Sequence, residues 1–194
     1  LIAIVGAFVF WQLRVSENKK AIKKLWDDVQ VAVNDDQYTR YTEALKAAQG
    51  ILAIDDGHQL TLSAMAYAEA VLATDHAVDG ALEHAKEHLA RADAAGGKPT
   101  DFQVAAHALI SYAERNYEQG LADIKRVQDQ GGSSPIIELE AFRLALATNP
   151  DSKDTDVQLR RLTSSVTSQA RVFNFLGWYY YQRENWGQAD EKFD

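Results

Sequence analysis

The sequence predicts an all-α protein built from antiparallel helical hairpins. Strong helix formers dominate its 194 residues, which include only 3 Pro, and 46% of the residues are hydrophobic, enough to bury a sizeable core. In several stretches apolar residues recur at spacings of three and four, as on the buried face of a helix. Short clusters of Gly, Asn, Asp and Pro separate these stretches, as expected for turns between paired helices.

The first segment is a run of eleven apolar residues, Leu1 to Trp11. A membrane-spanning helix needs about 20 apolar residues, so the run predicts the end of a longer span. We therefore expect residues 1–13 to be a partial single-pass anchor, with Leu1–Leu13 in contact with the lipid bilayer. Trp11 and Arg14 stand where an interfacial aromatic and a snorkelling base belong. The core of a signal peptide and a buried helix of a soluble protein are the alternatives, although no small-x-small cleavage site follows.

Residues 14–34 form a basic juxtamembrane stretch within the first expected helix. By the positive-inside tendency this flank favours a cytoplasmic side, although the rule compares two flanks and only one is visible. An ordinary solvated helix face is the alternative interpretation. The helix is expected to run from Ser16, which can cap it, to Asn34, with one apolar face. That face contains Leu25, Val29 and Val33, and the basic residues are Arg14, Lys19, Lys20, Lys23 and Lys24.

Residues 35–194 are expected to form one solenoid of stacked hairpins. Its first helix has an apolar stripe and ends near Asp55-Asp56-Gly57, and the next hairpin pairs residues 62–72 with residues 81–92. A loop at Gly96–Pro99 follows, after which Thr100 or Asp101 can cap a helix. The stripe of the first helix consists of Tyr38, Tyr41, Leu45, Ala48 and Leu52.

Three units of nearly constant length make up the second half of the chain. They begin at Asp101, Pro135 and Ala170, at intervals of 34 and 35 residues. Proline suits the start of a helix because its missing N–H costs little there. The turn within the second unit, residues 149–154, is longer than usual. Small or apolar residues of the first unit expected in the interior are Ala108, Gly120, Ile124 and Val127.

The last unit carries the most specific pattern, F-x2-L-G-x2-Y, followed by an alanine nine residues later and then x3-F. This pattern resembles the tetratricopeptide repeat (TPR), a helix–turn–helix unit of 34 residues. The resemblance implies a right-handed superhelix whose repeats act as a scaffold rather than as a catalyst. We expect Gly177 and Ala189 to permit a close helix crossing and the larger residues to fill the interior. The residues that carry the resemblance are Phe173, Leu176, Gly177, Tyr180, Ala189 and Phe193.

The TPR resemblance also implies a partner-binding groove, lined by the first helix of each hairpin. Apolar and aromatic side chains beside Arg and Asn suit an extended or helical peptide. Trp178 and Tyr181 are aromatic residues beyond those that the repeat core needs. Packing of these residues against a following repeat or capping helix is the alternative. The groove positions carried over are Phe102, Leu109, Tyr112, Leu139, Arg143, Arg171, Asn174, Trp178 and Tyr181.

No motif for catalysis or metal binding stands out, so we expect neither enzyme activity nor a cofactor. The absence of Cys excludes disulfides and thiolate metal sites. His84 and His88 share a helix face but lack a third ligand, and the Asp-rich turn at 151–156 lacks the Gly and Glu of a calcium loop. His107 is expected to be packed. A net charge of -8 disfavours nucleic acid as a partner.

These features favour a membrane-tethered TPR scaffold that binds or assembles protein partners. A permanent structural subunit of a larger membrane assembly is the main alternative, with its repeats buried against neighbouring subunits. A third possibility is a protein whose catalytic domain lies beyond Asp194.

Overall fold

The computed structural model describes residues 2–35, 37–165 and 170–193, with the side chains of residues 2–11, 13, 170 and 193 left out. The described residues form helices and no strand, so the predicted all-α class is confirmed. In chain order the helices are α1 (Ile2–Asn34), α2 (Tyr38–Leu52), α3 (Gln59–Asp75), α4 (Ala81–Ala95), α5 (Asp101–Ala113), α6 (Tyr117–Asp129), α7 (Pro135–Thr148), α8 (Lys153–Ser164), α9 (Ala170–Gln182) and α10 (Trp186–Phe193).

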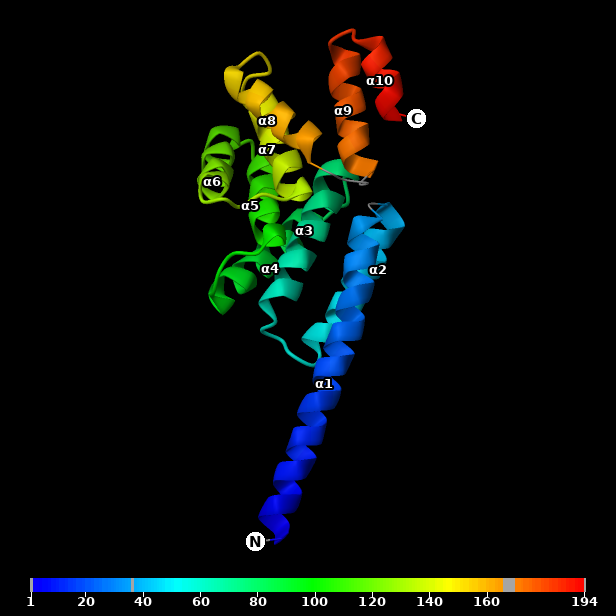
Figure 1. Cartoon of the computed structure of the whole chain (residues 1–194), viewed down its shortest axis with the longest axis vertical. Helices are drawn as coiled ribbons and strands as arrows, with labels where there is room; N and C mark the ends of the chain where they lie inside the picture. Colours follow the sequence, from blue (N-terminus) through cyan, green and yellow to red (C-terminus); the bar gives the residue numbers. More distant parts are fainter. Residues whose placement is uncertain (1, 36, 166–169, 194) are drawn as a thin grey trace.

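Consecutive helices pack in pairs, and the pairs are stacked (Figure 1). The packed pairs are α1 with α2, α3 with α4, α5 with α6, α7 with α8, and α9 with α10. The first helices α3, α5 and α7 also pack in a row, each against the next. This arrangement of hairpins is compatible with a helical repeat fold.

Helix α1 differs from the expectation that a helix begins at Ser16. It is one uninterrupted helix from Ile2 to Asn34, because no Gly or Pro near Ser16 breaks it. Its second half packs on α2 and buries Val29 and Val33, whereas its first half extends away from the other helices (Figure 1).

The apolar segment at the start of α1 was expected to be the end of a membrane anchor. Within the described residues, no helix is long and apolar enough to cross a membrane. Leu1 and the side chains of Trp11 and Leu13 lie outside the described residues. The anchor therefore stays a prediction.

Helices α5, α7 and α9 begin at Asp101, Pro135 and Ala170, where the three sequence units were expected to begin. Pro135 occupies the first turn of α7. Helix α9 also repeats the bounds of α5 at an interval of 69 positions, from Asp101 to Ala170 and from Ala113 to Gln182. The second helices of these two hairpins begin at the same interval.

The turns that end α5 and α9 share one backbone conformation. Arg115 and Glu184 both adopt a positive φ, of 63° and 57°. The N–H of the next residue, Asn116 or Asn185, then donates to the carbonyl five positions earlier at 2.8 and 3.0 Å. A left-handed residue with this bond is a common way to satisfy the last carbonyls of a helix. Two hairpins 69 residues apart are thus closed by the same local structure.

Close helix approach depends on Gly120 at the start of α6. A Cβ atom on Gly120 would lie 2.7 Å from Cβ of Ser111 in α5 and 3.1 Å from Cδ1 of Leu144 in α7. The absence of a side chain therefore lets α6 rest against both neighbours.

The start of α5 is fixed by a cap. Thr100 forms a reciprocal pair of hydrogen bonds with Gln103, which fixes where that helix begins.

Two groups of buried side chains form the core. The larger group connects α1 to α7, and the smaller one joins α7, α8 and α9. In α9 the buried face contains Val172, Leu176 and Tyr179. The expectation that Phe173 fills the interior is therefore wrong: its side chain is turned off this face and is 38% exposed. The side chain of Phe193 lies outside the described residues.

Candidate functional site

The nine predicted groove residues do not form one open surface. Leu109 and Leu139 are fully buried in the core and offer no surface to a partner, because each lies where neighbouring first helices pack together. Phe102 is half-buried, with its ring against Trp26 and Tyr67 at centroid distances of 6.2 and 5.6 Å. The remaining six form two groups, one buried and ionic, the other exposed and aromatic.

The first group is an ion-pair network in which two arginines meet on Asp75, at the end of α3. Arg143 of α7 donates to both carboxylate oxygens of Asp75, at 2.6 and 3.1 Å. Arg171 of α9 donates to Asp75 at 2.8 Å and to Glu140 of α7 at 2.9 Å. It also donates to the hydroxyl of Tyr67 at 2.6 Å. Three helices are thus joined by groups of balanced charge.

Burial makes this network sensitive to the loss of any member. The side chains of Arg143 and Arg171 are only 6% and 9% exposed, and that of Glu140 is 1% exposed. Nε of Arg143 lies 3.1 Å from Glu140, but the two atoms are not aligned for a hydrogen bond. Burial alone would raise the pKa of Asp75, but the charge of Arg171 and the hydrogen bonds from Arg143 outweigh it and hold that pKa well below its usual range.

Aromatic rings complete the surroundings of Arg143. The guanidinium lies 5.3 Å from the ring centre of Tyr112 and 5.1 Å from that of Phe175, within the range of a cation–π contact. Tyr112 is half-buried, and its ring also packs on Tyr117. Three groove positions therefore make internal contacts: Arg143 and Arg171 fasten α9 to α3 and α7, and Tyr112 joins α5 to α7.

The second group is a cluster of exposed aromatic rings on the α9–α10 hairpin, formed by Trp178, Tyr181 and Trp186. Their side chains are 58%, 47% and 53% exposed. The rings touch edge to face, with centroids 5.4 Å apart for Trp178 and Tyr181 and 4.9 Å apart for Tyr181 and Trp186. Asn174, one turn before Trp178 on α9, is also exposed. We call Trp178, Tyr181 and Trp186 the aromatic cluster.

Local structure explains how the aromatic cluster is presented. Trp178 and Tyr181 are three residues apart on α9 and so share a face. The turn at Glu184 then reverses the chain, and Asn185 accepts a bond from the N–H of Gln188 at 3.4 Å at the start of α10. Trp186, the first residue of α10, is thereby set beside Tyr181. Trp186 was not among the predicted groove residues, although its nearness in the sequence to Trp178 and Tyr181 was an available signal.

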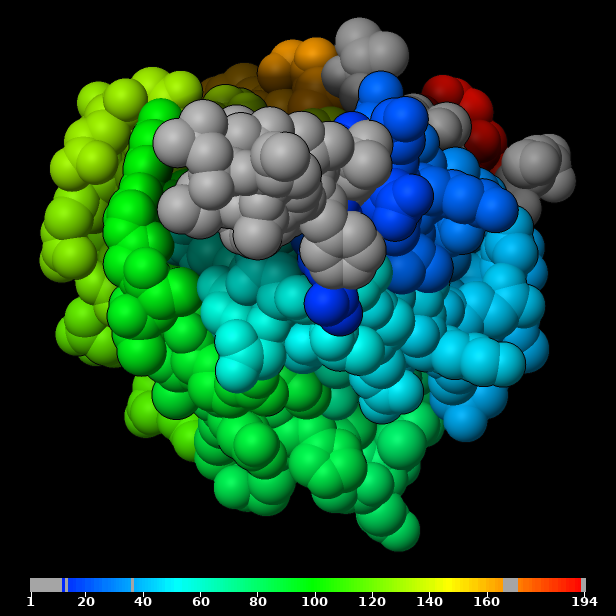
Figure 2. Space-filling model, turned by 90° about the horizontal axis from the view of Figure 1, so that it is seen from below, coloured from blue at the N-terminus to red at the C-terminus, as the bar shows by residue number. Residues whose placement is uncertain are grey.

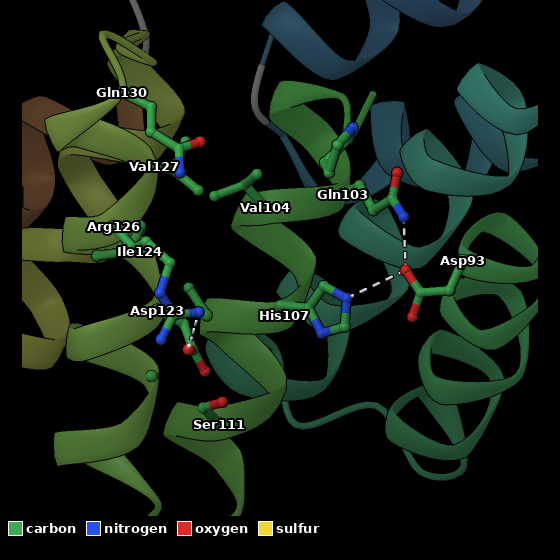
Figure 3. Close-up of a pocket in the computed structure, with 13 residues that line it drawn as sticks. Asp93, Gln103, Val104, His107, Ser111, Asp123, Ile124, Arg126, Val127 and Gln130 are labelled. Atoms are coloured by element: carbon green, nitrogen blue, oxygen red, sulfur yellow. Dashed lines mark hydrogen bonds and ion pairs between the residues drawn. The ribbon is translucent and has the colours of Figure 1, made fainter. Parts of the chain in front are cut away.

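A small pocket of about 270 Å³ lies between α4, α5 and α6 (Figure 3). Val104, Ile124 and Val127 form its apolar side, while Asp93 accepts hydrogen bonds from Gln103 and His107 on the other. The expectation that His107 is packed is wrong, because its side chain is 55% exposed and paired with Asp93 in water. The pocket is slightly below the usual volume of a ligand site.

The other titratable candidates make local pairs. Nδ1 of His88 lies 2.7 Å from Oε2 of Glu69 on α3, and His88 is half-buried. The Asp-rich turn is held by cations instead, since Arg183 pairs with Asp151 and Lys125 with Asp154. Among the described residues, no three His, Asp or Glu side chains come together as a metal site would require.

No known protein family, characterised protein or solved structure matches this chain. The geometry of its own residues therefore carries the functional argument.

Proposed function

We propose that this protein is a membrane-tethered helical-repeat scaffold of TPR type, which binds a protein partner through the aromatic cluster on α9 and α10. The single observation that carries the proposal is the exposure of three touching aromatic rings on one hairpin. Clusters of Trp and Tyr in contact with solvent are typical of the energetic centres of protein interfaces.

The attachment of α9 to the core is made by other side chains than these rings, which supports a binding role. Helix α9 is fastened to α7 and α8 through Val172, Leu176 and Tyr179, on another face. Arg171 adds ion pairs to α3 and α7. Trp178 and Tyr181 are therefore absent from the buried face of α9 and keep about half of their surface exposed. Natural proteins seldom keep large exposed aromatic patches unless these are used for interaction.

The membrane tether rests on the apolar run at the start of α1. That run belongs to the same helix that packs on α2, and the first half of this helix extends away from the body (Figure 1). A single rigid helix would hold the repeats at a fixed distance from the bilayer. The side of the membrane is proposed as cytoplasmic from the basic flank alone.

A permanent structural subunit of a larger membrane assembly is the second candidate. It is favoured by the exposure of Phe173, which adds a fourth exposed aromatic ring on the α9–α10 hairpin. An obligate interface is more apolar than a transient one and would cover these rings continuously.

The double substitution Trp178→Ala and Tyr181→Ala tests the proposed function. Each buried aromatic anchor commonly contributes about 2 kcal/mol or more to an interface, so partner capture should fall at least about 30-fold. The measurement is quantitative affinity capture from detergent-solubilised native membranes, with the full chain as bait. The melting midpoint should change little, because the core face of α9 is untouched.

Tyr38→Ala is the matched control. Tyr38 is 47% exposed, like Tyr181, and its ring also makes an edge contact, with His76 at 5.3 Å. Its removal from α2 should leave partner capture unchanged. An unchanged partner set in the double variant would reject the aromatic cluster as the binding site. Unfolding of the double variant would instead favour the permanent structural subunit.

A further inference from the structure

We propose that the exposed lysines of α1, where its projecting part meets the body, form a binding site for anionic phospholipid headgroups. The site consists of Lys19, Lys20, Lys23 and Lys24, with Arg14 at its edge, and we call it the basic stripe. The proposal deepens the proposed function, because it rests on the membrane tether and names the bilayer surface to which α1 binds.

The distribution of charge is the first observation. Residues 14–24 contain five basic residues and one acid, Glu17, so that they carry +4 in a chain whose net charge is -8. The rest of the molecule therefore carries -12. An anionic surface would attract the stripe and repel the body, which orients the molecule with α1 toward the membrane.

The second observation is that the basic stripe is exposed and uncompensated. All four lysine side chains are exposed, and no ion pair of theirs occurs among the described residues, although lysines of the body such as Lys86 and Lys125 are paired. Lys19, Lys20 and Lys23 line one shallow trough together with Ser16. Figure 2 views the molecule from the end from which α1 projects, the side that would face a bilayer.

The third observation is the distance of the stripe from the apolar run. Lys19 and Lys24, the two ends of the stripe, follow Leu13 by six and eleven residues of continuous helix, which is about 9 and 16 Å along the axis at 1.5 Å per residue. The potential of a charged bilayer decays over about 8 Å at physiological ionic strength. Flexible lysine stems shorten the remaining gap, so Lys19 and Lys20 can reach phosphates of the headgroup layer, and a tilt of α1 brings Lys23 and Lys24 closer to them.

The experiment uses the full chain with Ser16→Cys labelled by a polarity-sensitive dye and reconstituted into vesicles. The label is unique because the sequence contains no Cys. Vesicles contain phosphatidylcholine alone or with about 30% phosphatidylglycerol, a content that gives a strongly negative surface. The readout is protection of the dye from acrylamide, a neutral quencher. The apolar tether inserts into both vesicle types, so a difference in dye protection between them reports contact of the basic stripe with anionic headgroups.

We expect strong protection in anionic vesicles and little in neutral ones. Each basic residue close to an anionic surface is worth roughly a fivefold change, so Lys19 and Lys20 alone should shift the contact equilibrium by about 25-fold, and the more distant Lys23 and Lys24 add to this. Changing all four lysines to Gln should reduce protection to the level of neutral vesicles, and so should about 0.5 M salt. Changing all four to Arg should preserve it.

A charge-matched control distinguishes the effect of the basic stripe from the effect of the protein's net charge. The exposed basic residues Lys46, Lys98, Lys153 and Arg160 of the body, changed to Gln together, remove the same charge and should leave protection intact. Equal protection in both vesicle types, or equal loss in the control, overturns the proposal. Equal protection by duplex DNA also overturns it, as a general polyanion site. Failure of the tether has a different signature, since the protein would then not float with neutral vesicles.

Discussion

At the residue scale, Gly120 and Gly187 give opposite predictions for the same change. Gly120→Ala places a Cβ 2.7 Å from Cβ of Ser111 and should lower the free energy of unfolding by about 1–3 kcal/mol through overpacking. The Cβ added by Gly187→Ala in α10 meets nothing within 4 Å. This substitution should leave the free energy of unfolding unchanged or raise it by up to about 1 kcal/mol, because Ala favours a helix. Urea unfolding of both variants measures the two effects. Equal effects would show that α6 does not need a close approach.

His88 predicts a pH dependence of stability. The hydrogen bond with Glu69 raises the pKa of His88 above its usual value. Burial and the charge of Arg91 lower this pKa, and the charge of Glu87 raises it, but the hydrogen bond has the largest effect. The pair therefore stabilises the fold fully below pH about 6.5, and this contribution is lost as pH rises through the raised pKa. Between pH 6 and 9, wild type should lose more unfolding free energy than His88→Gln, measured by urea titration at each pH. Parallel curves would contradict this role.

At the element scale, the ion-pair network holds the α9–α10 hairpin. Asp75→Asn leaves Arg143 and Arg171 with one buried acid between them, which should cost about 3–5 kcal/mol of unfolding free energy. Because the pKa of Asp75 is held low, its stabilising effect is present above the unfolded value near 4 and is lost only in strong acid. The Asp154→Asn variant breaks an exposed pair with Lys125 and should cost less than about 1 kcal/mol. Hydrogen exchange should show faster opening of α9 in Asp75→Asn only.

The same network shows why sequence reasoning found the helices better than the site. Local spacing identified Asp101, Pro135 and Ala170 as helix starts, since caps, turns and apolar periods lie within a few residues of each other. The partners of Arg143 and Arg171 on Asp75 are 68 and 96 residues away. No local pattern contains such a contact, so both arginines were expected in an open groove.

The aromatic surplus of α9 was recognised in the sequence, because Trp178 and Tyr181 exceeded what a repeat core needs. The rotation of α9 about its own axis, which decides which aromatic residues are buried, was not predicted from the sequence. Burial of Val172 and Tyr179 against α7 and α8 turns Phe173 outward, and this choice depends on how neighbouring hairpins stack. Amphipathic periodicity fixes the spacing of a buried face, but a helix rich in aromatics offers more than one such face.

At the scale of the whole molecule, charge and shape act together. The first half of α1 projects from an acidic body, and the basic stripe lies where it meets that body. The exposed aromatic cluster lies on the last hairpin, away from the projecting end of α1 (Figure 1). Partner binding and membrane contact are thus assigned to opposite ends of the chain. Substitutions at one end should leave the other function intact, which makes the two proposals separable.

The membrane tether predicts how the protein fractionates. The full-length protein should fractionate with membranes and resist both high salt and alkaline extraction, because burial of about 20 apolar residues is not reversed by screening charge. Val5→Arg combined with Phe8→Arg should abolish this resistance, since each Arg costs about 3 kcal/mol within a span. The four-lysine Gln variant should keep it, because the basic stripe contacts the surface and does not insert. Release of wild type by salt alone would leave only a peripheral contact and reject the tether.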